Sequence, residues 1–261
     1  MGGDAGALWH FCARLRCPPG AASGRGWYAP RVSSDPTTLP AADDAPSSHL
    51  APTAFVDSDH PDVVALARRS CVTTDDAPAR AAALFLAVRD GLRYDPYAFT
   101  LDPEAYRASA VARRASGFCV PKAILLAALC RAQAIPARLG FADVRNHLQS
   151  AKLRALMGTD VFVFHGYAEL WLDGRWLKAT PAFDAALCAR FGVAPLVFDG
   201  RSDALFHEYD AGGRRYMEYV RYRGTFGDLP FEAMVEAFRS TYGALPEVDM
   251  AGRDEMFHGP R

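Results

Sequence analysis

The run from Ala123 to Cys130 constrains this chain most, because it is an uninterrupted apolar stretch of strong helix formers. A helix that is apolar on all sides is stable only where protein surrounds it. The Ile135-Pro136 pair must end this helix, because proline disfavours helical geometry at the residue before it. The sequence therefore predicts one buried central helix around which the rest of the fold is arranged.

Three shorter helices are predicted before the central one. Proline is favoured in the first helical turn, so Pro61 and Asp102-Pro103 mark two helix starts. Between these two helix starts, residues 73–75 offer N-terminal caps for another helix, which ends at Gly91. The helix that begins at Asp102-Pro103 is expected to end near Gly117.

Strand signals follow the central helix. The predicted strands are 137–144, 161–172, 175–180 and 217–222. Asp173-Gly174 lies between two β-prone runs, which is a strong hairpin signal. Residues 230–242 show apolar side chains at helical spacing and predict a closing helix. Helices first and an antiparallel sheet later predict an α+β domain.

The two ends of the chain differ in composition from its middle. Residues 1–53 are rich in Gly, Ala, Pro, Ser and Asp and lack a periodic apolar pattern. Such a segment buries too little apolar surface to offset its ordering entropy. We therefore expect a disordered extension over 1–53, a single domain over 54–250 and a flexible tail over 251–261.

Charge and cysteine content limit the partners and the cellular compartment that we expect. The 29 basic and 30 acidic side chains give a net charge of −1, so no global field favours nucleic acid or an anionic membrane as partner. The 6 cysteines are scattered, which argues against a disulfide framework and for a reducing compartment. No apolar stretch approaches the ~18 residues of a membrane-spanning helix. We expect a cytoplasmic protein with no nucleic-acid or membrane partner; the sequence indicates no oligomeric state.

Cys119 opens the central helix, directly after Gly117-Phe118. The positive end of a helix dipole and its unpaired N–H donors favour a thiolate, which is the form a nucleophile needs. The amide of Cys119 itself can hold the oxyanion of a tetrahedral intermediate. A lone buried cysteine is more often inert, and that is our reading of Cys71, Cys130 and Cys188.

His165 interrupts an otherwise apolar strand, where each ring nitrogen needs a partner or carries a desolvation cost. A two-residue turn at Asp173-Gly174 pairs Tyr167 with Thr180 and leaves His165 diagonal to Thr180 on the same face. Such diagonals lie about 7–8 Å apart, within reach of side chains. Thr180 is therefore placed to orient the imidazole.

These motifs together resemble the bacterial transglutaminase-like superfamily. The resemblance rests on Gly117-x-Cys119, Ile135-Pro136-Ala137-Arg138, His165-x-Tyr167-x-Glu169 and Trp176-x-x-x-Thr180-Pro181, and covers residues 60 to 185. It implies a papain-like fold with the nucleophile at the start of a central helix that packs on an antiparallel sheet. Gly166-Tyr167 stands where the family usually has Ala-Trp, which suggests a distinct subfamily.

The resemblance implies a triad of Cys119, His165 and the residue four positions after Trp176. The family's usual aspartate is Thr180 here, and a hydroxyl supplies no negative charge for an imidazolium. Either Thr180 is a weakened orienter, or Asp184 takes the role.

Substrate contacts are expected from Tyr94, Tyr167 and Asn146, with Tyr94 and Tyr167 as candidates for a second oxyanion donor. The chemistry implies no metal and no organic cofactor. The predicted function is a thioester-forming enzyme that hydrolyses or transfers the acyl group of a peptide, protein or small amide. Two alternatives stay open: a non-catalytic binding module on the same fold, and a biosynthetic acyl transferase that uses a carrier-bound thioester.

Overall fold

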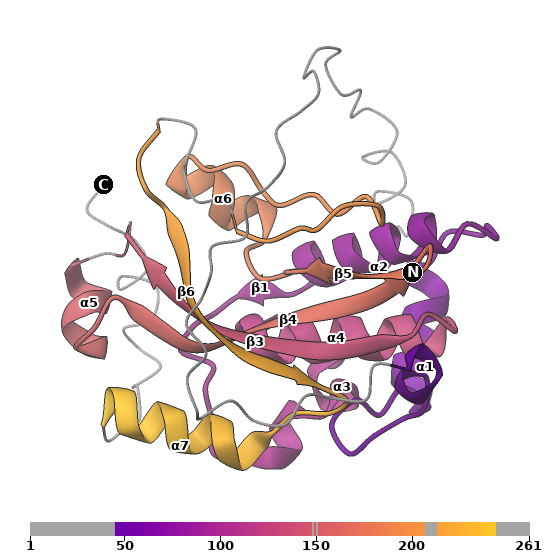
Figure 1. The fold of residues 1–261 in the computed structure, drawn as a ribbon, viewed down its shortest axis with the longest axis horizontal. Coiled ribbons are helices and arrows are strands. Elements are labelled where there is room, and N and C mark those ends of the chain that lie inside the picture. Colours follow the sequence, from indigo (N-terminus) through magenta and orange to yellow (C-terminus); the bar gives the residue numbers. More distant parts are fainter. Residues whose placement is uncertain (1–44, 148, 150, 207–212, 244–261) are drawn as a thin grey trace, which may run out of the picture. The chain divides into compact units, whose positions relative to one another are not determined.

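The computed structural model describes residues 45–147, 149, 151–206 and 213–243. Its helices are η2 (Pro46–His49), α1 (Pro61–Ser70), α2 (Ala77–Gly91), η3 (Pro103–Tyr106), α3 (Ala108–Val111), α4 (Cys119–Ala132), α5 (Ala151–Met157), α6 (Ala185–Phe191) and α7 (Phe231–Tyr242). Its strands are β1 (Arg93–Tyr94), β2 (Ser116–Gly117), β3 (Ala137–Asn146), β4 (Val161–Leu172), β5 (Arg175–Ala179) and β6 (Met217–Phe226). The α4 helix runs along one face of the main sheet (Figure 1), and the predicted α+β class is confirmed.

The main sheet has four antiparallel strands in the order β5-β4-β3-β6. The β4–β5 hairpin pairs Leu172 with Arg175, as the Asp173-Gly174 turn predicts, and the ladder continues to Ala168 opposite Ala179. The last strand and the closing helix, β6 and α7, also form where the apolar pattern predicts them.

The central helix α4 is buried from Cys119 to Arg131. Its two cations are satisfied by backbone carbonyl groups. Lys122 donates to the carbonyls of Arg89 and Leu92, over 2.9 and 2.6 Å, at the end of α2. Arg131 donates to three further carbonyls, so neither charge is left without a partner. Neither α4, with 14 residues, nor any other helix among the described ranges is long and apolar enough to cross a membrane.

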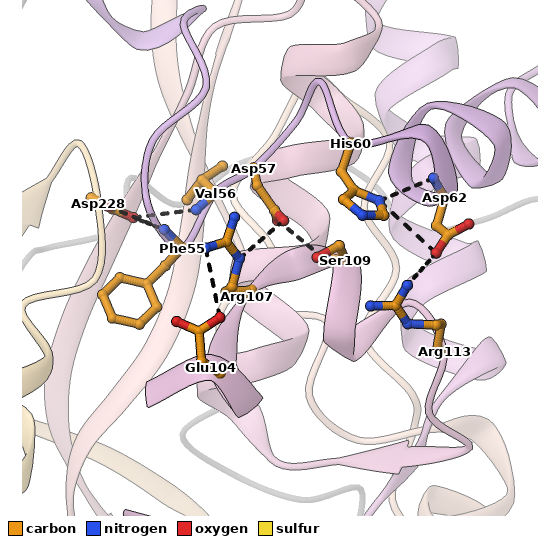
Figure 2. Close-up of polar contacts among 10 residues, drawn as sticks. All are labelled: Phe55, Val56, Asp57, His60, Asp62, Glu104, Arg107, Ser109, Arg113 and Asp228. Carbon is orange, nitrogen blue, oxygen red and sulfur yellow. Dashed lines mark hydrogen bonds and ion pairs between the residues drawn. The ribbon is translucent and has the colours of Figure 1, made fainter. Parts of the chain in front are cut away.

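The prediction of a single helix from Asp102-Pro103 to near Gly117 is wrong. Arg107 takes an extended conformation (φ −59°, ψ 137°) and separates η3 from α3. The Asp57 carboxylate fixes this break, since it accepts the Ser109 N–H at 3.0 Å and the Arg107 Nε–H at 3.4 Å (Figure 2). Beyond α3 the chain forms β2, which pairs in parallel with β1 and leads into α4.

The predicted extension 1–53 reaches too far into the chain. Residues 45–53 include η2, whose His49 is buried, and the Ala51 carbonyl accepts from Arg131 at 2.7 Å. Just beyond it, the Asp228 carboxylate accepts the N–H groups of Phe55 and Val56 (Figure 2). These contacts supply the partners that composition alone does not reveal. Residues 1–44 and 244–261, and with them the predicted tail 251–261, lie outside the described residues.

Candidate active site

Cys119 is the first residue of α4, and its side chain is nearly buried. The backbone N–H groups of Gly166, Val120 and Cys119 itself point at the sulfur and favour the thiolate. Burial outweighs them and raises the pKa of the Cys119 thiol to about 11. The expected lowering of the thiol pKa is therefore wrong for this structure: the helix start contributes in the expected direction, but desolvation dominates.

Gly166 lets strand β4 pass against the first turn of α4. A Cβ at this position would lie 3.0 Å from the Val120 Cα and 3.3 Å from its Cγ2, so a larger residue would force the strand and helix apart. This close approach is what brings the Gly166 N–H to the sulfur of Cys119. His165 immediately precedes Gly166 on β4, so its backbone lies close to the first turn of α4.

His165 lies on β4 opposite Ala142, with only 5% of the residue exposed. Its ring packs against Phe206 at 4.8 Å between centroids and against Tyr219 at 6.1 Å. The buried Nε2 atom has no hydrogen-bond partner among the described residues. Desolvation lowers the pKa of His165 to about 3, so the imidazole is neutral at pH 7.

Thr180 directly follows β5 and is 1% exposed. Its N–H donates to the Ala204 carbonyl at 2.9 Å, while its hydroxyl oxygen is buried without a hydrogen bond among the described residues. Burial raises the pKa of Tyr219, and the nearby Thr180 hydroxyl partly lowers it. The two hydroxyl groups nevertheless do not meet hydrogen-bond geometry. Thr180 and His165 thus share Tyr219 as a neighbour.

Asp184 is engaged elsewhere. One carboxylate oxygen caps α6 by accepting the Leu187 N–H at 2.9 Å, and the other accepts the Tyr94 N–H at 2.8 Å. Both oxygens therefore fix backbone, and no contact among the described residues joins Asp184 to His165. The role of Asp184 as the orienting group finds no support in this geometry.

The three expected substrate contacts fall in different places. The Tyr94 phenol lies near Cys119, because a charge on that sulfur adds to the effect of burial in raising the pKa of Tyr94. Tyr167 is 2% exposed and packs over Gly140, where a Cβ would come within 2.2 Å of its ring. That packing gives Tyr167 an interior role. Asn146, four residues beyond the partner of His165, lies roughly 13 Å further along β3 at ~3.3 Å per residue.

Two neighbours of the candidate site were not identified from the sequence. Phe206 and Tyr219 both contact the His165 ring, from the segment before β6 and from β6 itself. Tyr219 belongs to a predicted strand, but only the pairing of β6 with β3 places it one strand away from β4, where its ring contacts His165. Burial raises the pKa of Tyr106 and of Tyr242, and a charge on Cys119 adds to that effect in both.

A family comparison agrees with this reading of the fold. A family model described as the transglutaminase-like superfamily matches residues 64–181, a range that holds Cys119, His165 and Thr180. A putative cysteine protease from Cytophaga hutchinsonii is 22% identical, with a TM-score of 0.41, over 56% of this chain and 45% of that one. The chain thus spans less than half the length of that structure. No curated protein matches it. Residues 64–181 thus match the superfamily that the sequence motifs resemble.

Proposed function

We propose that this protein is a cysteine-dependent enzyme that forms a thioester at Cys119, with His165 as the base. The observation that carries the proposal is the approach of β4 to the first turn of α4. It directs the Gly166 N–H at the Cys119 sulfur and sets His165 one residue away. A nucleophile at a helix start beside a histidine is the arrangement that acyl transfer requires.

The proposed reaction starts from a neutral pair. At pH 7 the thiol, with a pKa of about 11, and the imidazole, with a pKa of about 3, are both uncharged. As the sulfur attacks the substrate carbonyl, the S–H proton passes to His165, whose Nε2 has no hydrogen-bond partner among the described residues. The tetrahedral oxyanion receives a hydrogen bond from the Cys119 N–H, with the Tyr94 hydroxyl as a second donor.

The second half of the reaction returns the enzyme to its starting state. His165 gives its proton to the leaving group, the carbonyl–leaving-group bond breaks and a thioester remains on Cys119. Water or an amine then loses a proton to His165 and attacks the thioester, and the C–S bond breaks as the sulfur takes back the proton. Hydrolysis and transfer share the first half, so the proposal covers protease, amidase and transamidase activity on a peptide, protein or small amide.

Thr180 is the proposed orienting group in this scheme. Its hydroxyl can hold the imidazole in one tautomer but supplies no charge for an imidazolium. A neutral orienter agrees with a pair that stays uncharged until the substrate arrives.

A non-catalytic binding module is the alternative that a specific observation favours, because a buried neutral thiol beside a neutral imidazole is also what an inert core contains. A carrier-bound thioester as acyl donor remains a narrower form of the enzyme proposal.

Trapping of the acyl-enzyme tests the proposal. We expect p-nitrophenyl acetate to acetylate Cys119, as located by mass spectrometry of digested protein, with the adduct absent in Cys119→Ala and strongly reduced in His165→Ala. Cys188→Ala is the matched control, since burial also raises the pKa of this α6 thiol to about 11, but no contact among the described residues joins it to His165. Equal acetylation of wild type and His165→Ala would favour the binding module.

A further inference from the structure

The strand that carries His165 is irregular directly before it. In the β3–β4 ladder His165 pairs with Ala142, whereas the next pair joins Phe162 to Val144. Asp143 therefore stands opposite two residues, Val163 and Phe164, which is the pattern of a β-bulge. Phe164 has a φ of 54°, a left-handed conformation that bulky residues rarely adopt.

Side chains take up the backbone donors at this bulge. The Val163 N–H donates to the Tyr242 hydroxyl of α7 at 2.7 Å, and the Phe164 N–H donates to the Asp143 carboxylate at 3.1 Å. A bulge disrupts the regular strand-to-strand pairing, and these two contacts replace it. The β4 backbone is therefore held at two successive residues from outside the ladder.

Asp143 is itself fixed by Arg223 of β6. The guanidinium donates through Nε and Nη2 to the two carboxylate oxygens, at 2.5 and 2.9 Å. The same guanidinium lies over the Phe164 ring, 4.8 Å from its centroid. With side-chain exposures of 8% for Asp143 and 17% for Arg223, the pair is largely shielded from water. Arg223 thus makes two contacts at the bulge: it binds the Asp143 carboxylate, which accepts the Phe164 N–H, and it packs over the Phe164 ring.

We propose that Asp143, Arg223 and Tyr242 are positioning residues for His165, because they hold the bulge that sets the direction in which β4 presents this histidine and the Gly166 N–H. Bulges next to active sites commonly re-aim a side chain. An effect of these residues on catalysis rests on the proposed function. Their effect on the placement of His165 does not, because it can be measured without substrate.

Asp143→Asn tests the proposal with little change in shape, and two readouts are needed. The first is the titration of the His165 imidazole by NMR, which reports its surroundings directly. The second is the rate of Cys119 alkylation by iodoacetamide against pH, located by mass spectrometry well below each variant's Tm. Asp228→Asn is the matched control, since that carboxylate likewise accepts backbone N–H donors, but from Phe55 and Val56.

We expect Asp143→Asn to shift the His165 titration and to slow Cys119 alkylation at neutral pH on the order of tenfold, less than the ~100-fold that a 1 Å misplacement can cost. Arg223→Lys, which keeps the charge but loses the fork, should lie between it and wild type. Asp228→Asn should lower Tm and leave both readouts unchanged. If Asp143→Asn does not fold, Tyr242→Phe, which removes one hydroxyl and keeps the ring, tests the same claim.

The two proposals fail in different ways. A fall in Tm with an unchanged titration and an unchanged alkylation profile in Asp143→Asn would overturn the positioning role while the proposed function stands. A shifted titration, together with alkylation that never depends on His165, would uphold the positioning role and overturn the proposed function.

Discussion

Buried polar groups are treated differently in α4 and at the β4–β5 end of the sheet. In α4, Lys122 and Arg131 donate to backbone carbonyl groups. At the sheet, His165 Nε2 and the Thr180 hydroxyl are equally buried but have no hydrogen-bond partner among the described residues. Most buried polar groups are satisfied within the fold, so one without a partner needs an explanation, and substrate binding or proton transfer would supply one at this site. Other buried polar atoms of the described residues, such as Thr53 Oγ1 and Trp176 Nε1, also lack a hydrogen bond, so the contrast concerns these two regions and is not a rule for the whole fold.

The largest effect is expected for Lys122→Met, which removes one of the two buried cations that α4 satisfies with backbone carbonyl groups. Losing the ammonium leaves the Arg89 and Leu92 carbonyls unpaired, at a cost of about 1–3 kcal/mol. Burial lowers the pKa of Lys122 from 10.5 to about 7. Between these values the unfolded chain binds the proton that the folded chain has released, so this group makes stability rise with pH across that window. The Tm difference between wild type and Lys122→Met should therefore grow from pH 7 to pH 9.

Thermal unfolding monitored by circular dichroism at several pH values measures this difference. Lys178→Met is the matched control, because it removes a partly exposed lysine that lies over the Tyr222 ring. Parallel curves of Tm against pH for wild type and Lys122→Met would show that Lys122 is not the source of the dependence.

Thr180→Asp tests the candidate catalytic groups by placing a carboxylate at position 180. A carboxylate facing the imidazole favours its protonated form and should raise the pKa of His165 from about 3. The neutral pair then moves towards an ion pair, and alkylation of Cys119 at pH 6 should rise on the order of tenfold. Thr180→Asn, which adds similar bulk without charge, should leave the rate near that of wild type. Equal rates in the Asp and Asn variants would place residue 180 out of reach of the imidazole.

Asp184→Asn and Thr180→Val should separate stability from rate. Asp184→Asn loses one of two backbone contacts and should cost about 1 kcal/mol of stability with little change in Cys119 alkylation. Thr180→Val removes a hydroxyl that has no hydrogen bond within the described part of the chain, so it should alter the rate while Tm hardly moves. Tm and alkylation measured on the same samples decide between them. A rate loss in Asp184→Asn at unchanged Tm would return Asp184 to the site.

Tyr219→Phe carries the smallest expected effect. Its hydroxyl accepts the Phe206 N–H at 3.5 Å, and a neutral hydrogen bond contributes about 0.5–1.5 kcal/mol, so loss of this contact between two neighbours of the His165 ring should lower the alkylation rate a few-fold. The matched control is Tyr222→Phe, whose ring stacks on Tyr219 at 5.9 Å. Identical rates for the two variants would remove Tyr219 from the account.

The sequence predicted those parts of the fold that local pattern controls. The apolar run after Cys119, the Asp173-Gly174 turn and the closing helix each carry their signal within a few residues, and all three form as expected. The break at Arg107 depends on Asp57, fifty residues away, so no local pattern reveals it. The same holds for residues 45–53, whose partner Arg131 lies far along the chain.

The candidate site divides in the same way. Cys119 and His165 stand out because each is chemically unusual for its segment. The pKa of Cys119 could not be predicted from its place at a helix start, since its direction depends on how completely the fold excludes water. The bulge at Phe164 and the place of Tyr219 depend on pairing between β3, β4 and β6, which sequence order does not give.

The most direct test of the central claim is the pH dependence of iodoacetamide labelling at Cys119, located by mass spectrometry, in wild type and His165→Ala. A neutral pair predicts labelling that changes little across neutral pH in wild type, because the imidazole takes the proton as the sulfur reacts. In His165→Ala, labelling should be slow and rise only towards the raised thiol pKa of about 11. Superimposable profiles would show that His165 does not serve Cys119 and would contradict the account.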